Sequence, residues 1–248
     1  MHRKLLLTSM AMLSLFFMLI SVNGHNPGYE VVAVYGSTPT IDGSINVDEW
    51  DDASSVQFNN TEVFVKQDGE NLYIGFKVFP SPHQVSDDYV AICFDLKNTG
   101  DIEEPSLNYI AVAVYPENRT LAENYWTPYS GWTPTRVSDW TASVNSTLEM
   151  WQVEFNIPFS KVKIIAGEEK TIGVFFDVYQ HEEEEPFTWP PWYENVLEHP
   201  EDWGDITSTG YNWIPEFPSW IILPLFLAAT LAAIFFKKRL LNQRSYEW

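Results

Sequence analysis

The 248-residue chain carries 34 acidic and 14 basic side chains, which give a formal net charge of −20 at pH 7. This sign excludes nucleic acid as a partner, because contacts to a phosphate backbone need positive charge. Cys93 is the only cysteine, so no disulfide can form within the chain. Its apolar neighbours indicate a small buried hydrophobe and not a reactive thiol.

The N-terminus has the layout of a secretory signal peptide. Polar and basic residues at positions 2–4 precede an uncharged, largely apolar run at residues 5–22, an arrangement typical of such targeting segments. We therefore expect residues 1–24 to be the signal peptide, with cleavage before His25. An uncleaved signal anchor is the alternative.

Residues 25–213 predict one all-β domain, because apolar runs rich in β-branched and aromatic residues alternate with Asp, Asn, Gly and Pro. The runs occupy residues 30–35, 61–67, 71–79, 88–96, 108–115, 140–144, 149–157 and 171–180. Asp68 and Gly69 separate two of them and predict the tight turn of an antiparallel hairpin. Short strands at regular spacing favour an antiparallel, jelly-roll-like β-sandwich.

The last part of this domain, residues 182–213, differs in composition. Four consecutive glutamates are followed by a segment rich in proline and tryptophan. Because proline cannot donate a ladder hydrogen bond, a central strand is excluded there. We expect a long ordered loop over the sandwich.

The C-terminal segment predicts a membrane anchor. Residues 220–236 are 17 uncharged, largely apolar residues, and as a helix they span about 25 Å, enough for a thin bilayer core. Basic residues follow at once in the tail at 237–248, and such residues stay on the cytoplasmic side. We expect a single-pass protein of the cell surface, with the β-domain outside and residues 214–219 as a linker. A buried core helix is the alternative.

Seven short motifs follow one another along the β-domain. They are PTIDG at 39–43, EW at 49–50, NLYIGFKV at 71–78, VAICFD at 90–95, WQVEFNIP at 151–158, IGVFFD at 172–177 and WGDI at 203–206. Together they resemble the family-nine carbohydrate-binding modules, which belong to the DOMON-like β-sandwiches. The resemblance covers about residues 37–207 and implies a sandwich that binds sugar without being an enzyme.

A second resemblance concerns residues 214–219, which read IPEFPS. With the apolar span and the basic cluster that follow, they are similar to archaeal C-terminal sorting signals of the Pro-Glu-Phe kind. This implies removal of the helix and its replacement by a lipid. The tail at 237–248 is longer than in such signals, so retention of the helix stays open.

Four tryptophans are candidates for sugar binding, because aromatic rings bind the apolar C–H faces of sugars while nearby polar groups bind the hydroxyls. The resemblance implies that two tryptophans sandwich a terminal sugar and that one precedes the closing Trp-Gly motif, where Trp189 and Trp192 lie. Trp126 and Trp132 are the candidates for the other. The alternative is packing at an open end of the sandwich. The tryptophans expected in the core are Trp50 and Trp151.

A group of carboxylates near the start of the domain is a candidate calcium site. It contains Asp42, Asp48, Glu49 and Asp51. Oxygen ligands at this density suit Ca²⁺ outside the cell, and the resemblance implies structural calcium. The alternative is a solvated acidic face, because the spacing matches no EF-hand.

The sequence favours a binding protein over an enzyme, since no catalytic or phosphate-binding motif is present. A haem-b-binding DOMON-like domain is one alternative, with Met150, His83 and His181 as candidate ligands. A structural or protein-interaction module of the cell envelope, without a sugar site, is the other. Three sequons predict N-glycosylation, at Asn59, Asn118 and Asn145.

Overall fold

The computed structural model describes part of the chain. The described residues are 25–26, 28–79, 87–100, 109–115, 117, 119–127, 130–147, 149–181, 186–191, 193–208 and 213. All belong to the first of two compact units, Met1–Ile214. The predicted signal peptide, linker, membrane helix and cytoplasmic tail lie outside them. Within the described part, no helix has the length and apolar character that a membrane span requires.

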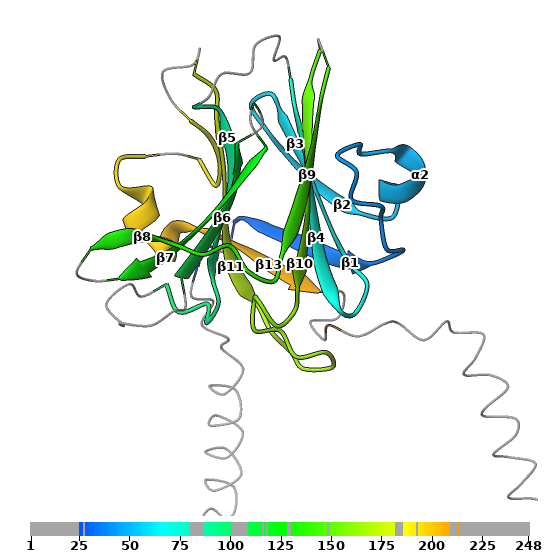
Figure 1. Ribbon diagram of the computed structural model, residues 1–248. Helices are drawn as coiled ribbons and strands as arrows, with labels where there is room; N and C mark the ends of the chain where they lie inside the picture. Colours follow the sequence, from blue (N-terminus) through cyan, green and yellow to red (C-terminus); the bar gives the residue numbers. More distant parts are fainter. Residues whose placement is uncertain are drawn as a thin grey trace, which may run out of the picture. The chain divides into compact units, whose positions relative to one another are not determined.

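The strands form two layers that face each other, seen edge-on in Figure 1. Layer A has the order β8 (Gly131–Thr135), β7 (Thr120–Thr127), β6 (Tyr109–Tyr115), β5 (Tyr89–Asp95), β11 (Ile172–Tyr179) and β13 (Gly204–Ser208). Layer B has the order β3 (Thr61–Gln67), β4 (Asn71–Val78), β10 (Trp151–Pro158) and β9 (Thr141–Ser146). Two short strands pair at the side, β12 (Phe187–Trp189) with β11 and β2 (Ser54–Phe58) with β3. The short helices are α2 (Val47–Trp50), η1 (Val196–Glu198) and η2 (Pro200–Asp202).

Strand β1 (Glu30–Tyr35) connects the two layers. Its first residues pair with β13 and its last two pair with β3, and both pairings are parallel. The all-β class expected from the sequence is confirmed, but the purely antiparallel arrangement is corrected. Parallel neighbours need long connections, and residues 36–53 together with β2 supply one between β1 and β3.

Eight strands match the runs expected from the sequence to within two residues at each end. The hairpin turn predicted at Asp68 and Gly69 joins β3 to β4, and Gly69 takes a positive φ of 91° there. Among the described residues, five further strands lie outside the predicted runs, namely β2, β7, β8, β12 and β13. Pro134 interrupts the pattern of β8, which is an edge strand and therefore tolerates a missing backbone donor.

The core lies between the layers, where alternate residues of both sheets meet. Phe76 of β4 contacts Phe176 of β11 edge to face, with ring centroids 5.6 Å apart. Trp140 stacks on Phe155 of β10. Trp151 is completely buried, which confirms its expected place in the core.

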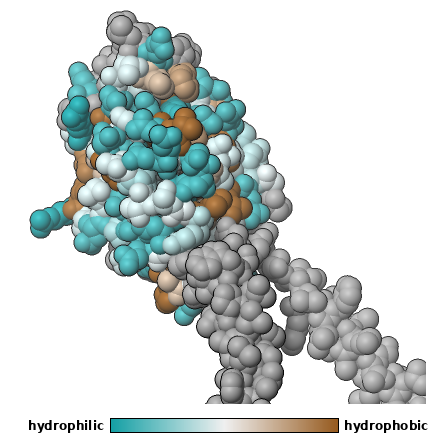
Figure 2. Space-filling model, turned by 90° about the vertical axis from the view of Figure 1, so that its right-hand side faces the viewer, coloured by the Kyte–Doolittle hydropathy of each residue, from teal (hydrophilic) through white to brown (hydrophobic). Residues whose placement is uncertain are grey.

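The outer face of layer B is covered by residues 36–53. The indole N–H of Trp50 donates to Glu154 Oε1 at 2.8 Å, and both side chains are buried. Lys66 is buried beside them and forms an ion pair with Asp52. Trp50 is thus a packing residue, as expected. Figure 2 shows this side of the molecule, whose surface is mostly hydrophilic with scattered hydrophobic residues.

Candidate functional site

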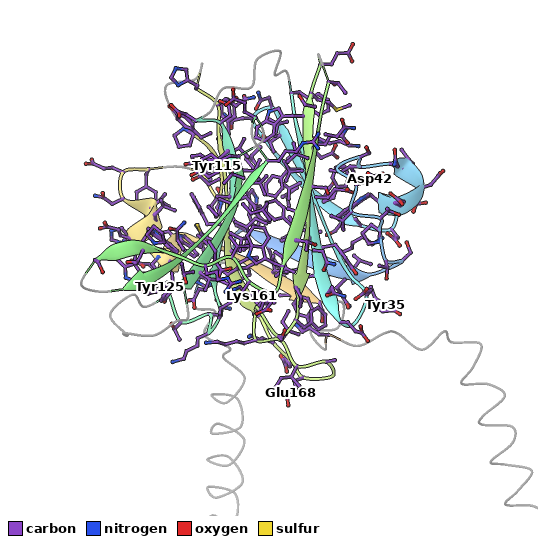
Figure 3. All side chains as sticks on the ribbon, in the orientation of Figure 1. Tyr35, Asp42, Tyr115, Tyr125, Lys161 and Glu168 are labelled. Carbon is purple, nitrogen blue, oxygen red and sulfur yellow. The ribbon has the colours of Figure 1, made fainter. Side chains whose placement is uncertain are left out.

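Three tyrosines form a row on the outer face of layer A. Tyr89 of β5 pairs with Tyr179 of β11, and Tyr115 of β6 lies on the other side of Tyr89. Ring centroids are 5.6 Å apart for the stacked pair Tyr89 and Tyr179, and 5.9 Å apart for Tyr89 and Tyr115. All three side chains are half-buried. We call these residues the tyrosine row, and Tyr115 is labelled in Figure 3.

Small side chains follow the tyrosine row along the same face. The cross-strand register aligns Asp177, Ala91, Ala113 and Ala122 on four neighbouring strands. Ala91 and Ala113 are each 7% exposed. Cys93 comes two positions after Ala91 on β5, and its burial confirms the sequence-based assignment. Asp177 is therefore the one polar member of the aligned set.

Asp177 is buried but only partly hydrogen-bonded. The hydroxyl of Tyr89 donates to Asp177 Oδ2 at 3.0 Å, whereas Asp177 Oδ1 is buried without a partner among the described residues. Thr188, which pairs with Asp177 across β11 and β12, also has a buried hydroxyl without a partner there. Leaving such an atom unpaired costs about 1–3 kcal/mol, and in native proteins it calls for a water, an ion or a ligand.

Burial raises the pKa of Asp177 from 3.8 to about 7, and the hydrogen bond from Tyr89 opposes the rise. The cause is the loss of water around the charged form. Near neutral pH the carboxyl group therefore occurs in both forms and can donate or accept a hydrogen bond. Burial, together with the charge of Asp177, raises the pKa of Cys93 well above its usual range. The thiol stays protonated and unreactive.

Trp126 of β7 and Trp132 of β8 are cross-strand partners, also on the outer face of layer A. Their rings lie edge to face with centroids 5.7 Å apart, and both side chains are half-buried. They pack against a buried cluster that includes Tyr109 and Trp203. The structure thus brings two of the predicted sugar-binding residues together. We call them the tryptophan pair.

Trp189 lies elsewhere, in the main core. It is 7% exposed, stacks on Phe176 with ring centroids 5.4 Å apart and contacts Tyr29 edge-on. Because Trp189 is the cross-strand partner of Phe176, the pairing of β12 with β11 turns its ring towards the inside. This burial does not support the expectation that Trp189 presents a sugar platform, which stays a sequence-based prediction. Trp192 lies outside the described residues.

The four carboxylates expected to hold calcium are not gathered into one site. Asp42 and Glu49 each accept a hydrogen bond from a neighbouring backbone N–H, and Asp48 and Asp51 are exposed. Among the residues that the structure describes, no group of three or more His, Cys, Asp or Glu side chains is placed to hold a metal ion. Calcium at this corner stays a sequence-based prediction, which thermal unfolding with and without EDTA tests.

The predicted glycosylation sites differ in their surroundings. Asn59 is exposed at the turn between β2 and β3, with a φ of 46°. The side-chain amide of Asn145 on β9 donates to Ser44 Oγ at 3.0 Å. Asn118 lies outside the described residues. Glycan attachment stays a prediction at all three positions.

The candidate haem ligands start from different parts of the fold. His181 follows β11 of layer A and its side chain is 58% exposed. Met150 directly precedes β10 of layer B. His83 lies outside the described residues. This placement lends the haem alternative no support.

The sequence patterns do not single out the tyrosine row, Asp177 or Thr188. Each tyrosine stands at or next to an end of a run that predicts a strand, and alternation along these strands places it away from the core. Each run contains its own outward tyrosine. The three tyrosines come together only through the strand order β6, β5, β11, which the separate runs do not reveal.

Two solved structures share this fold. One is a family-9 carbohydrate-binding module from Caldicellulosiruptor kristjanssonii in complex with cellotriose, with a TM-score of 0.56 and 19% identity, covering 76% of this chain and 100% of that one. The other is a family-9 module of the same organism in complex with glucose, with a TM-score of 0.56 and 20% identity, covering 73% of this chain and 95% of that one. At such identities the likeness is one of fold. No protein-family model and no curated protein sequence matches the chain.

Proposed function

We propose that this protein is a non-catalytic carbohydrate-binding module whose sugar site is formed by the tyrosine row with Asp177 and Thr188. The observation that carries the proposal is the combination of half-buried aromatic rings with two buried oxygens that have no partner among the described residues. Aromatic rings bind the apolar faces of sugars, and a few fixed polar groups bind their hydroxyls. The fold supports this class, because structures of that fold contain cellotriose and glucose.

A sugar hydroxyl suits Asp177 in either protonation state, because a hydroxyl both donates and accepts hydrogen bonds. Thr188 adds a hydroxyl group beside the carboxyl group of Asp177. Tyr89 holds the other carboxyl oxygen, so the orientation of Asp177 is fixed before a ligand arrives, which lowers the entropic cost of binding. Since both free oxygens are buried, the proposal requires a ring of the row other than Tyr89 to move aside when the sugar enters.

The sequence also predicts where in the cell this function takes place. The predicted signal peptide at 1–24 and the predicted anchor at 220–236 put the module, in this proposal, on the outside of the cell membrane. Either fate of the helix, retention or exchange for a lipid, leaves the domain at the cell surface. Structural calcium at the carboxylate corner is the further sequence-based expectation.

Isothermal titration of the full chain with mono- and oligosaccharides tests the proposal. Tyr115→Ala should weaken binding by about tenfold or more, a loss of at least about 1.4 kcal/mol, because a ring of the row is removed. Tyr35→Ala is the matched control, since Tyr35 is exposed at the end of β1 and lies apart from Tyr115 in Figure 3. The proposal fails if no sugar binds, or if Tyr115→Ala binds like the control.

A further inference from the structure

We propose that the tryptophan pair is a second sugar subsite, so that the module binds a chain of a neutral polysaccharide along the outer face of layer A. This inference rests on the proposed function. It adds to the tyrosine row a second point of contact on the same face of the sheet, and it assigns the ligand as an oligosaccharide and not as a single terminal sugar.

The tryptophan pair carries two hydrogen-bond donors for which the described part of the chain supplies no acceptor. The Nε1 atoms of Trp126 and Trp132 are both buried without a partner among the described residues. Four buried indoles of the domain donate to a carboxylate or a carbonyl, as buried indoles usually do, namely those of Trp50, Trp140, Trp203 and Trp213. Two adjacent unpaired donors cost about 1–3 kcal/mol each. Hydroxyl and ring oxygens of a sugar would supply the missing acceptors.

Exposure distinguishes this pair from an unpaired indole in the core. Trp151 Nε1 also lacks a partner among the described residues, but Trp151 is fully enclosed. The rings of Trp126 and Trp132 are half-buried and meet at 74°, so they offer parts of two faces nearly at a right angle. An apolar sugar face can contact one ring, and because both Nε1 atoms are buried, a ring has to rotate before sugar oxygens reach the indole N–H groups.

Small side chains connect the two aromatic ends. Tyr115 and Tyr109 are six positions apart on β6, a distance of about 20 Å along a strand, and Tyr109 belongs to the cluster against which the tryptophan pair packs. Figure 3 labels Tyr115 and Tyr125, the residue before Trp126, at separate ends of this layer. The outward positions between the ends are Ala111 and Ala113 on β6 and Ala122 and Asn124 on β7. Ala111 belongs to the buried cluster that contains Trp203, whereas Ala122 and Asn124 are half-buried and small, so an extended chain can lie along β7.

The negative charge of the domain favours an uncharged polysaccharide as the ligand. Residues 25–214 contain 32 acidic and eight basic side chains. An acidic polysaccharide would approach a surface of its own sign, and like-charge repulsion slows and weakens such an encounter. A polysaccharide of uncharged sugars avoids this cost, so the inferred ligand is a neutral glycan.

A chain-length series tests the inference. The full chain is titrated with glucose and with cello-oligosaccharides up to cellohexaose, and we expect the affinity to rise with length until the ligand spans both ends. Trp132→Ala should lower the affinity for cellohexaose by about tenfold or more, while binding of the shortest ligand changes by less than about twofold. Trp132→Phe keeps most of the packing but removes the N–H, and it should show an intermediate loss.

The indole N–H resonances of Trp126 and Trp132 give a second readout that does not depend on the variants folding well. They should shift with cellohexaose and stay unchanged with glucose. The second subsite is overturned if the affinity does not rise with ligand length. It is also overturned if Trp132→Ala loses as much affinity for short ligands as for long ones. Either result leaves the proposed function in place. Binding of a uronic-acid oligosaccharide tighter than cellohexaose overturns the neutral class. The absence of any sugar binding overturns both proposals.

Discussion

Asp177 and Thr188 oppose each other across the β11–β12 pair, and each holds a buried side-chain oxygen without a partner among the described residues. An ionised carboxylate is costly at such a position, because burial removes water and supplies too few donors in its place. The folded protein therefore prefers the protonated form of Asp177. Its stability should depend on pH for this reason.

The contribution of Asp177 to stability should be lost as the pH rises. Burial raises the pKa of Asp177 from 3.8 to about 7, so between these values the folded chain retains a proton that the unfolded chain has released. The contribution is complete below about pH 4 and is lost as the pH passes 7, by up to about 4 kcal/mol. Urea unfolding at about pH 5 and about pH 8 measures the difference.

Asp177→Asn tests the assignment, because an amide does not titrate in this range. The variant should show a clearly smaller loss of stability between the two pH values than the wild-type protein. Asp48→Asn is the control, since Asp48 is exposed at the start of α2 and its replacement should leave the profile unchanged. A wild-type profile in Asp177→Asn would show that the titrating group is a different one.

His25 predicts a second contribution with the same sign. Its Nδ1 lies 2.9 Å from Asp205 Oδ1 and its Nε2 lies 3.3 Å from Asp95 Oδ2. Burial lowers the pKa of His25, but the hydrogen bonds and charges of Asp205 and Asp95 outweigh burial and leave the pKa above 6.5. The stabilisation is therefore present in full below about pH 6.5 and is lost as the pH rises through the raised pKa.

His25→Gln should cost about 3–5 kcal/mol near pH 5.5 and less near pH 9, because it leaves Asp95 and Asp205 buried without their cation. His199→Gln is the control, since the ion pair of His199 with Glu201 is about half exposed. Urea unfolding of both variants at the two pH values measures the effect. Equal losses for His25→Gln at both values would contradict a charged imidazole in the folded state.

Trp50 should be essential for holding residues 36–53 on layer B. Its indole N–H donates to Glu154, whose other carboxyl oxygen accepts the backbone N–H groups of Asp42 and Gly43 at 2.9 and 2.7 Å. Trp50→Phe removes one donor from a buried carboxylate and should cost about 1.5–3 kcal/mol. Urea unfolding measures the loss, and proteolysis within residues 36–53 should become faster. Trp132→Phe is the matched control, because the Trp132 N–H has no acceptor among the described residues to lose.

The sequence predicts those strands in which apolar and less apolar residues alternate regularly within the strand itself. In β4, Leu72, Ile74 and Phe76 alternate with less apolar positions and face the core, so local alternation is enough. β12 has only three residues in a proline-rich segment, and β8 contains Pro134. Their pairing depends on the neighbouring strand, which a local pattern does not contain.

The candidate site depends even more on contacts between distant residues. Tyr115 and Tyr179 are brought to opposite sides of Tyr89 by strand pairings that join separate parts of the chain. Composition indicates aromatic binding residues in general but does not say which rings remain outside. Trp189 shows the consequence, because its ring direction is fixed by the register of β12 on β11. The sequence therefore predicts the type of site better than its members.

Trp189→Ala should destabilise the domain without removing sugar binding. The ring stacks on Phe176, and a Cβ added at Gly204 would lie only 2.6 Å from it, so Trp189 packs directly against β11 and β13. Truncation of a buried tryptophan costs about 3–5 kcal/mol through lost contacts and the cavity left behind. Urea unfolding measures this loss, and titration well below the unfolding transition should give nearly wild-type affinity. Trp132→Ala should behave in the opposite way, with weaker binding of long ligands and a smaller loss of stability. If Trp189→Ala kept its stability and lost all binding, Trp189 would be a sugar platform despite its burial.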